Sequence, residues 1–389
     1  MVKRILWAIA CCICACNVPD PPASTGGVQL EPGPCGRGLV VAASGEDYAS
    51  TNISLVDFEG ATLSDSFLSS GAATAGASAP LSGDVVLPLA VGQSGKVVLL
   101  DRQNNTVTWV EPTTAQVTAQ LSVSEGANAI PHDYLELDPR KAYVSRFLAG
   151  DLWIVDPSTG NKTGQIALPQ GTQKPFPDRM LRSGDTVIVV LQRFADGYGQ
   201  AADGELVGIV SDQVSWQQTL PGYANCGGMD VSPSGKLLAV TCTGVFPDSN
   251  STSEEQIAHS GIVLFDLTSL PPPELRRFAV AAALGEPVGW SVAFVDEDTL
   301  LGRAVGDLTS GRADTAFTLA LSSGEVRELA VAEPYALGDI RCTPRCAGLC
   351  LMADASLGGL RRWTRSLESL AYVEPGQSVG LPPRYLGGF

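Results

Sequence analysis

A β-rich run that ends in Asp or a polar substitute recurs along the chain at nearly constant spacing, and this recurrence restricts the fold most. Typical runs are Trp153-Ile-Val-Asp156 and Val263-Leu-Phe-Asp266. The runs end at Asp57, Asp101, Asp156, Ser211, Asp266, Leu321 and Thr364, the last two being weaker matches. The steps are 44, 55, 55, 55, 55 and 43 residues, and each step is long enough for four short strands with their loops.

A repeat of this kind predicts blades arranged around an axis. The folded part contains no stretch of a dozen or more residues with apolar positions at helical spacing, and turn dipeptides separate the β-rich runs. A four-stranded unit with one apolar face must stack on its neighbours, and radial closure removes exposed edges between units. Seven such units fill residues 36–374. We therefore predict an all-β, seven-bladed β-propeller, with six or eight blades as alternatives.

The N-terminus has the layout of a secretory signal. Lys3 and Arg4 precede an apolar run from Ile5 to Ala15, which is well short of the roughly 20 residues that a membrane-spanning helix needs. The run ends in Ile13-Cys14-Ala15-Cys16, which resembles the bacterial lipobox. The resemblance implies that residues 1–15 are a lipoprotein signal peptide and that Cys16 is lipidated. An ordinary signal peptide cleaved near Ala15 is the alternative.

The residues after Cys16 predict where the protein is held. Asn17, rather than Asp, follows the cysteine, and in lipobox proteins this implies the outer membrane, facing the periplasm or the cell surface. Residues 16–34 are rich in Pro, Gly, Ser and Thr and predict a flexible linker, so the propeller domain spans residues 35–389. A formal net charge of −16 excludes nucleic acid as a partner. We expect a monomer attached to the membrane through its lipid.

The third repeat carries a family resemblance. Its Asp138-Pro-Arg-Lys-Ala-Tyr-Val-Ser and Leu152-Trp-Ile-Val-Asp-Pro-Ser-Thr-Gly160 segments resemble the YVTN-type β-propeller repeat, and Ser232-Pro-Ser-Gly-Lys-Leu-Leu-Ala-Val240 is similar. The run that begins Met180-Leu-Arg-Ser-Gly-Asp resembles uncharacterised propeller lipoproteins of myxobacteria. The resemblance implies the fold and export, and it implies no activity, because propellers carry many unrelated functions.

Six cysteines remain after the signal and anchor, and an even number in an exported chain predicts three disulfides. They are Cys35, Cys226, Cys242, Cys342, Cys346 and Cys350. Counting residues about the predicted hairpin turns opposes Cys226 to Cys242 and Cys342 to Cys346. Cys35 would then join Cys350 and close the ring, with Cys342 or Cys346 as alternative partners. A zinc site in the Cys342-x3-Cys346-x3-Cys350 segment is the competing interpretation.

The start of an inner strand lies at the channel mouth of a propeller, where ligands commonly bind. Asp133, beside His132, and also Asp178 and Asp339, occupy similar places in the third, fourth and seventh repeats. Converging carboxylates would favour a hard cation such as calcium or a cationic ligand. Alternatively, each carboxylate accepts backbone N–H groups in a separate turn. No other cofactor is expected, and the sequence assigns no metal.

No catalytic set stands out from the sequence. The chain holds only two histidines and contains neither a nucleophile elbow nor a phosphate loop nor a dinucleotide fingerprint. We therefore predict a non-catalytic binding or scaffold module, with an unknown protein or glycan as its ligand. The alternative is a propeller enzyme of the lactonase or quinoprotein-dehydrogenase type.

Overall fold

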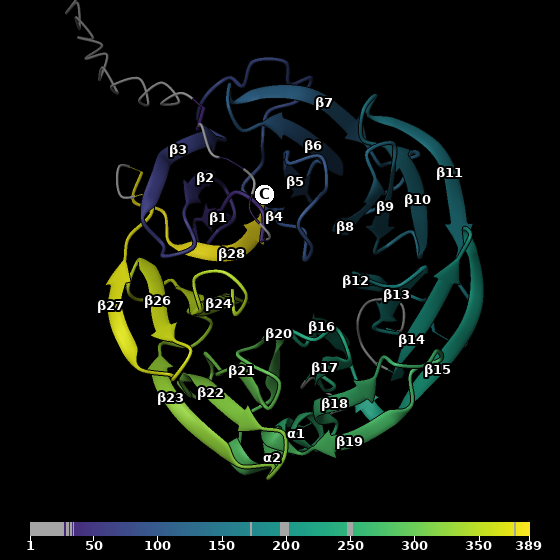
Figure 1. The fold of residues 1–389 in the computed structure, drawn as a ribbon, viewed down its shortest axis with the longest axis vertical. Helices are drawn as coiled ribbons and strands as arrows, with labels where there is room; N and C mark the ends of the chain where they lie inside the picture. Colours follow the sequence, from purple (N-terminus) through teal and green to yellow (C-terminus); the bar gives the residue numbers. More distant parts are fainter. Residues whose placement is uncertain are drawn as a thin grey trace, which may run out of the picture.

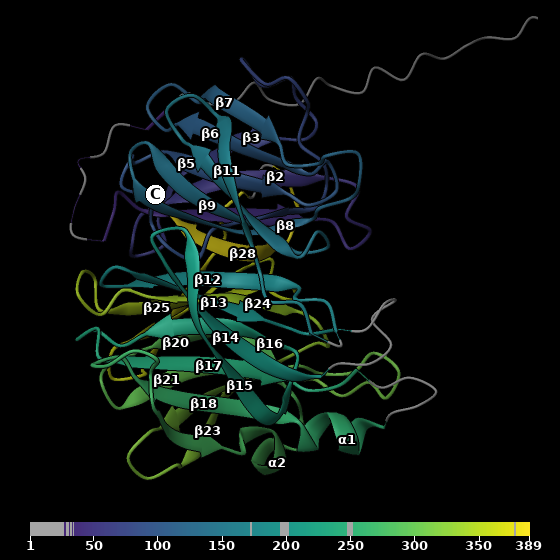
Figure 2. The ribbon, with the colours of Figure 1, turned by 90° about the vertical axis from the view of Figure 1, so that its right-hand side faces the viewer.

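The computed structural model describes residues 27–28, 31, 33, 35–171, 173–194, 202–246, 252–376 and 379–389. Cys16, the predicted signal peptide and most of the predicted linker lie outside these residues. The described chain forms a disc of seven four-stranded antiparallel blades around a central axis (Figure 1 and Figure 2). The prediction of a seven-bladed propeller is thus confirmed. None of the described helices is long and apolar enough to cross a membrane.

Within each blade the four strands follow one another from the axis outward. Blade 1 consists of β28 (Pro383–Gly388), β1 (Leu39–Ser44), β2 (Thr51–Val56) and β3 (Thr62–Ser69), and blade 2 consists of β4 (Val85–Val86), β5 (Val97–Asp101), β6 (Thr106–Glu111) and β7 (Gln116–Ser122). Blade 3 consists of β8 (Pro131–Asp138), β9 (Lys141–Arg146), β10 (Asp151–Asp156) and β11 (Asn161–Ala167), and blade 4 consists of β12 (Pro177–Ser183), β13 (Thr186–Leu191), β14 (Asp203–Val210) and β15 (Gln213–Ala224). Blade 5 consists of β16 (Cys226–Val231), β17 (Leu237–Thr243), β18 (Ser260–Asp266) and β19 (Glu274–Phe278). Blade 6 consists of β20 (Val288–Phe294), β21 (Thr299–Ala304), β22 (Asp314–Ala320) and β23 (Val326–Ala332). Blade 7 consists of β24 (Leu337–Cys342), β25 (Leu349–Asp354), β26 (Gly359–Thr364) and β27 (Ser369–Val373).

The two ends of the folded chain share one blade. β28 pairs antiparallel with β1, with Leu39 opposite Gly388 and Val41 opposite Leu386 (Figure 1). The first blade therefore lacks its inner strand until the last strand is added. The sequence had suggested that each repeat forms one blade, whereas blade 1 combines strands from both ends of the chain. This interlock closes the ring by backbone hydrogen bonds between segments that lie more than 300 residues apart.

The recurrent Asp lies at the end of the third strand, or directly after it, in blades 1, 3 and 5. Asp156 Oδ1 accepts from the backbone N–H of Ser158 at 2.8 Å, and Asp266 Oδ1 accepts from that of Thr268 at 2.8 Å. Such a side-chain turn directs the chain into the fourth strand. Blade 2 differs, because Asp101 ends its second strand and Glu111 ends its third. The apolar run of β5 resembles the third strands of the other blades, so the sequence pattern selected the second strand of blade 2; counted from Glu111, the first two steps are 54 and 45 residues (111 − 57 and 156 − 111).

Apolar side chains fill the spaces between blades. Trp109 of blade 2 is fully buried and its Nε1 donates to the hydroxyl of Tyr134 in blade 3 at 3.1 Å. Trp153 of blade 3 is buried in the same cluster. Similar clusters lie between the other blades, so each blade completes the core of its neighbour.

The described residues form three disulfides, and two of the expected pairings are wrong. Cys226–Cys242 joins directly opposed residues of β16 and β17, as expected. Cys342, however, pairs with Cys350, and Cys35 pairs with Cys346. The turn after β24 is longer than the count about Pro344 assumed, because Thr343 N donates to Leu349 O across the hairpin. Cys342 therefore opposes Cys350, and Cys346 at the loop tip reaches Cys35.

In the described segments two short helices accompany the strands, α1 (Ser253–Ala258) and α2 (Val280–Leu284). α1 begins with a capping box, in which Thr252 Oγ1 accepts from Glu255 N and the Glu255 side chain accepts from Thr252 N. The sequence Thr252-Ser-Glu-Glu255 carries this signal, although the helix is too short to show a helical period of apolar residues.

Candidate functional site

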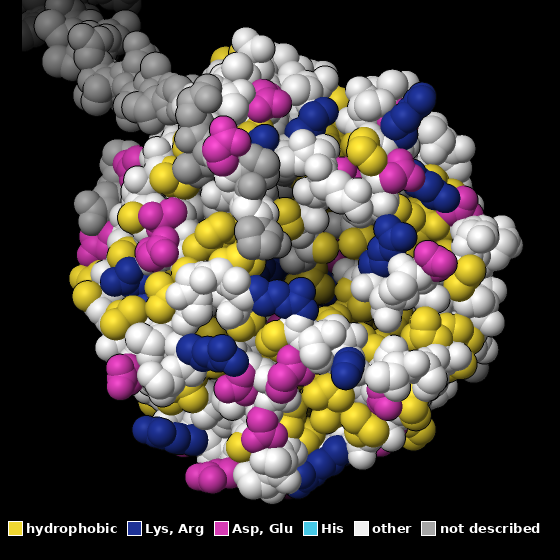
Figure 3. Space-filling model, in the orientation of Figure 1, with side chains coloured by type: hydrophobic (Ala, Val, Ile, Leu, Met, Phe, Trp, Pro, Cys, Tyr) yellow, Lys and Arg dark blue, Asp and Glu magenta, His cyan; other side chains and the backbone are white. Residues whose placement is uncertain are grey.

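A pocket of about 550 Å³ opens at one mouth of the channel. All seven blades contribute to its wall. Inner strands place His132, Asp178 and Asp339 there, and the segments after second strands place Phe147 and Phe194. The volume lies in the range of small-molecule sites, and the mouth is therefore the candidate functional site. Figure 3 shows one face of the disc with a central hollow bordered by basic and apolar side chains.

The same backbone kink precedes the inner strands of blades 3, 4 and 5. Ile130, Phe176 and Asn225 have φ values of 48°, 47° and 52°, in the left-handed region that residues other than glycine rarely occupy. Their carbonyls accept from Phe147 N, Gln192 N and Thr243 N, which extends each hairpin beyond its regular ladder. Strained residues of this kind persist where the surrounding structure fixes them, and they are enriched at binding and catalytic sites.

Aromatic rings from four successive blades form one half of the mouth, and all of them except the buried Phe176 line the pocket. We call this set the aromatic arc, and its members are Phe147, Phe176, Phe194, Phe246 and Trp290. Neighbouring ring centroids are 4.9, 5.8, 6.5 and 5.7 Å apart in that order. His132 stacks on Phe147 at 4.1 Å with an angle of 5° between the ring planes. The arc offers a continuous apolar surface for a planar ligand.

A hydrogen-bonded group of polar side chains lies beside the arc. His132 Nδ1 is 3.1 Å from Asp178 Oδ1, and the Gln192 side-chain amide donates to the other Asp178 oxygen. Burial lowers the pKa of His132 despite the attraction of Asp178, so the imidazole is neutral at neutral pH. Gly227 allows this approach, because a β-carbon there would lie 2.7 Å from Trp290 Cδ1 and closer still to Asp178.

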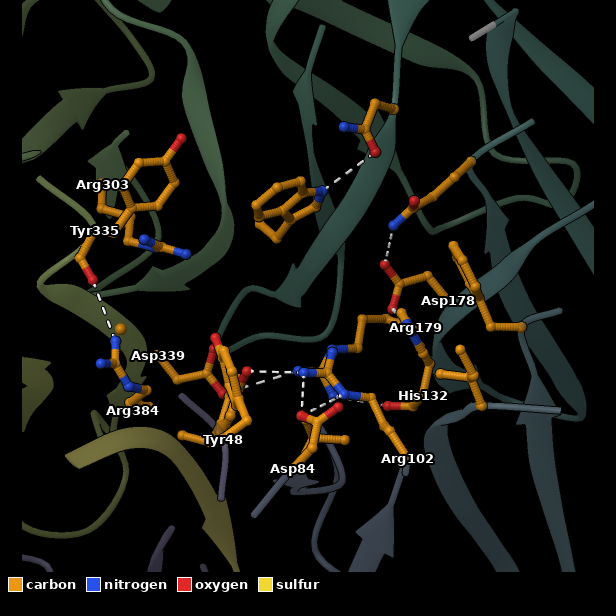
Figure 4. A pocket seen from close by; sticks show the side chains of 18 of the residues that line it. Tyr48, Asp84, Arg102, His132, Asp178, Arg179, Arg303, Tyr335, Asp339 and Arg384 are labelled. Atoms are coloured by element: carbon orange, nitrogen blue, oxygen red, sulfur yellow. Dashed lines mark hydrogen bonds and ion pairs between the residues drawn. The ribbon is translucent and has the colours of Figure 1, made fainter. Parts of the chain in front are cut away.

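Arg179 lies at the floor of the pocket between carboxylates (Figure 4). Its guanidinium is 3.7 Å from Asp133 Oδ1 and 3.8 Å from Asp339 Oδ2. Asp133 is fully buried and accepts the backbone N–H groups of Leu89 at 2.9 Å and Met180 at 2.7 Å. Asp133 thus connects blades 2, 3 and 4 beneath the pocket. The sequence had suggested that a metal ion or a cationic ligand would neutralise these carboxylates, and here the guanidinium of Arg179 supplies that positive charge.

Burial of Asp133 predicts a pH-dependent effect on stability. Burial raises its pKa from 3.8 to about 6, against the opposing effect of Arg179 and the backbone donors. The folded protein therefore holds this proton more tightly than the unfolded chain, and the contribution is present in full below about pH 4 and is lost as pH rises through about 6. Asp133→Asn does not titrate, so we expect it to destabilise the protein more at pH 4 than at pH 7.5, by about 2 kcal/mol.

Urea unfolding of the wild type and of Asp133→Asn between pH 4 and 8 checks this expectation. Asp185→Asn is the matched control, because the Asp185 side chain is 99% exposed, and its effect should be the same throughout. An Asp133→Asn effect that stays constant over this range contradicts a raised pKa.

Basic side chains line the other part of the mouth. Arg102 pairs with Asp84, with Nε 3.0 Å from Oδ1, and also donates to the hydroxyl of Tyr385 at 3.1 Å. Arg303 donates to the Leu337 carbonyl, and Arg384 Nη1 donates to the Tyr335 carbonyl at 3.4 Å. In Figure 4, Arg303 and Arg384 lie on one side of the pocket, and His132 and Asp178 lie on the other.

The site residues expected from the sequence separate into two groups. His132, Asp178 and Asp339 line the pocket, whereas Asp133 lies below it and contacts backbone groups. Among the described residues, no three His, Cys, Asp or Glu side chains are arranged to hold a metal ion. The arginines and the aromatic arc were not expected. The signal that could have found the arc is that Phe147, Phe194 and Phe246 each follow a second strand within three residues.

The comparisons concern the fold. No family model and no curated protein matches the sequence. The β-propeller domain of Myceliophteria thermophila Cps50 (Swd1) aligns over 87% of this chain and 99% of its own, with a TM-score of 0.55 and 11% identity. A putative 6-phosphogluconolactonase from Bacteroides uniformis aligns over 90% of this chain and 98% of its own, with a TM-score of 0.54 and 11% identity. The dihydro-heme d1 dehydrogenase NirN, in complex with DHE, aligns over 91% of this chain and 68% of its own, with a TM-score of 0.53 and 13% identity. These similarities show a shared fold alone.

Proposed function

We propose that the protein is a lipid-anchored binding module of the bacterial cell envelope whose channel-mouth pocket holds a small ligand without transforming it. The observation that carries the proposal is the pocket, whose wall comes from all seven blades. The kinks at Ile130, Phe176 and Asn225 fix that wall in place, and a pre-formed wall reduces the entropy lost on binding. Three disulfides support an oxidising compartment such as the periplasm or the cell surface.

Binding is tested by adding small-molecule extracts of the native envelope to the purified propeller, residues 17–389. We expect one fraction to raise the melting temperature by several degrees, and the active compound to be recovered unchanged. Phe246→Ala should remove the effect, because Phe246 belongs to the aromatic arc and is 38% exposed, so its loss should not unfold the protein. Tyr372→Ala is the matched control, an aromatic residue 47% exposed on the outer strand β27. Equal effects of the two substitutions contradict the proposed site.

The anchor is tested by Cys16→Ser. The lipobox resemblance of Ile13-Cys14-Ala15-Cys16 predicts that the variant leaves the membrane fraction or accumulates unprocessed. Fractionation of the envelope measures this. Cys14→Ser is the control, since Ser is more usual than Cys at that lipobox position and the variant should stay attached. Membrane attachment of Cys16→Ser equal to that of the wild type refutes lipidation.

An enzyme is the second candidate, and the His132–Asp178 pair favours it. A neutral imidazole held by a carboxylate is a general-base arrangement, and this pair faces the pocket. His132→Gln distinguishes the candidates. An enzyme would retain its ligand and lose turnover, whereas a binding module shows no turnover in the wild type either.

A further inference from the structure

The pocket wall is divided into an apolar part and a basic part. The aromatic arc runs through blades 3 to 6, while Arg102, Arg303 and Arg384 come from blades 2, 6 and 1. Together with Arg179, four arginines line the pocket, against the three aspartates Asp84, Asp178 and Asp339. The lining side chains therefore carry one more positive than negative charge, which Asp133 beneath the pocket offsets at Arg179, in a chain whose net charge is −16.

The arginines differ in whether a carboxylate neutralises them. Arg102 pairs with Asp84, and Arg179 lies between Asp133 and Asp339. Among the residues that the structure describes, no carboxylate lies within 4.0 Å of the Arg303 or Arg384 guanidinium. Both are held by carbonyl oxygens alone. Two guanidinium groups on one side of the pocket are thus available to a negatively charged ligand.

Two buried donors at the same pocket also lack acceptors. Asn225 is fully buried, and its Oδ1 accepts from Trp290 Nε1 at 3.3 Å, while its Nδ2 has no hydrogen-bond partner. Arg303 Nε is likewise buried without a partner. Leaving a buried N–H unsatisfied is costly, and both side chains belong to the pocket wall, so turning either N–H toward an acceptor on a bound ligand would stabilise the complex. Because both of these unmatched groups are donors, they select a ligand rich in acceptors.

We infer that the pocket binds an organic anion with a planar apolar ring, whose acid group lies against Arg303 and Arg384 and whose ring packs on the aromatic arc. The acid can be a carboxylate, a sulfonate or a phosphate, since all three present oxygens to a guanidinium. This inference rests on the proposed function, because it names the ligand class of that same site. A cationic ligand is disfavoured, since the carboxylates at the pocket already have positive or donor partners.

Two matched fluorescent probes test the inference on the purified propeller. 8-Anilinonaphthalene-1-sulfonate and N-phenyl-1-naphthylamine share the same ring system, and only the first carries an acid group. Isothermal titration calorimetry should give one site for the sulfonate, with an affinity at least tenfold above that for the uncharged probe. Quenching of Trp290 fluorescence, absent from Trp290→Phe, should accompany saturation.

Substitutions then assign the acid group and the ring. Arg303→Gln and Arg384→Gln should each weaken the sulfonate about tenfold and leave the uncharged probe unchanged. Arg327→Gln on the outer strand β23 is the control and should change neither. Phe246→Ala should weaken both probes. Within the described part of the chain, the hydrogen bonds of the Arg384 side chain are both 3.4 Å long, so Arg384→Gln tests the acid position even if Arg303→Gln lowers stability.

The remaining outcomes of the probe and substitution experiments each refute either the proposed function or the inference of an anionic ligand. If neither probe binds, the mouth is not a small-molecule site, and the proposed function fails with the inference. If both probes bind equally well, or if Arg303→Gln and Arg384→Gln have no effect on the sulfonate, the site binds small molecules and only the assignment of an anionic ligand fails. If Arg327→Gln weakens the sulfonate as much as Arg303→Gln, the charge effect is not local and the inference is again refuted.

Discussion

Deletion of residues 383–389 is expected to prevent the propeller from folding. These residues form β28, the inner strand of blade 1, and end in Phe389. Leu386 and Phe389 are fully buried, and large-to-small changes at such positions cost about 2–5 kcal/mol each. The deletion removes both and also leaves the edge of β1, whose residues are all buried, without its partner. The two side chains alone account for about 4–10 kcal/mol, which is comparable with the stability of about 5–15 kcal/mol that typical domains have.

Far-UV circular dichroism, soluble yield and thermal unfolding measure the outcome. Two single substitutions separate strand formation from side-chain loss. Leu386→Asp should behave like the deletion, because a charge would enter the core between blades. Arg384→Gln, two residues earlier on the same strand, should fold normally, because that side chain faces the pocket. A deleted protein with a native spectrum and a melting temperature within a few degrees of the wild type shows that β28 is dispensable for closure.

The sequence predicted the blade number but not how strands are assigned to blades. The marked positions lie at the end of the third strand in six of the seven blades, which preserves a spacing of about 55 residues, and in blades 1, 3 and 5 an Asp occupies that position. β28 was not detected, because Pro383-Arg-Tyr-Leu-Gly-Gly388 contains proline and two glycines, which are rare in strands. Its partner β1 lies at the other end of the chain, and local pattern holds no information about such a pairing.

The site was predicted only where one strand position determines it. Asp178 and Asp339 begin inner strands, and the topology of a propeller brings such positions to one mouth. Arg303, Arg384 and Arg102 reach the mouth from β21, β28 and the segment after β5, whose lengths and kinks are set by tertiary packing. Asp133 shares the inner-strand position but faces Leu89 N and Met180 N instead, because a neighbouring backbone can satisfy a carboxylate as well as a ligand can.

Removal of the Cys35–Cys346 disulfide is expected to cost about 5 kcal/mol of unfolding free energy. The cysteines are 311 residues apart, so the bond restricts almost the whole unfolded chain, and loop-entropy models give such long loops the largest stabilisation. The bond joins the segment before β1 to the loop between β24 and β25, which are parts of the first and the last blade. It thus closes the ring covalently beside the β28 interlock. Urea unfolding of the Cys35→Ser, Cys346→Ser double variant measures the loss.

The Cys342–Cys350 bond provides the matched control within the same hairpin loop. Its cysteines are 8 residues apart and sit opposite each other on strands that are already hydrogen-bonded. The loop-entropy difference between the two bonds is about 3 kcal/mol, so Cys342→Ser with Cys350→Ser should destabilise the protein by that much less. Peptide mapping without reduction first verifies both linkages. Equal losses for the two double variants would contradict the prediction. The Cys35–Cys346 bond is more stabilising only if it restricts the unfolded chain more than the Cys342–Cys350 bond does. Equal losses would therefore mean that the unfolded chain is already restricted between Cys35 and Cys346, or that β28 alone determines closure.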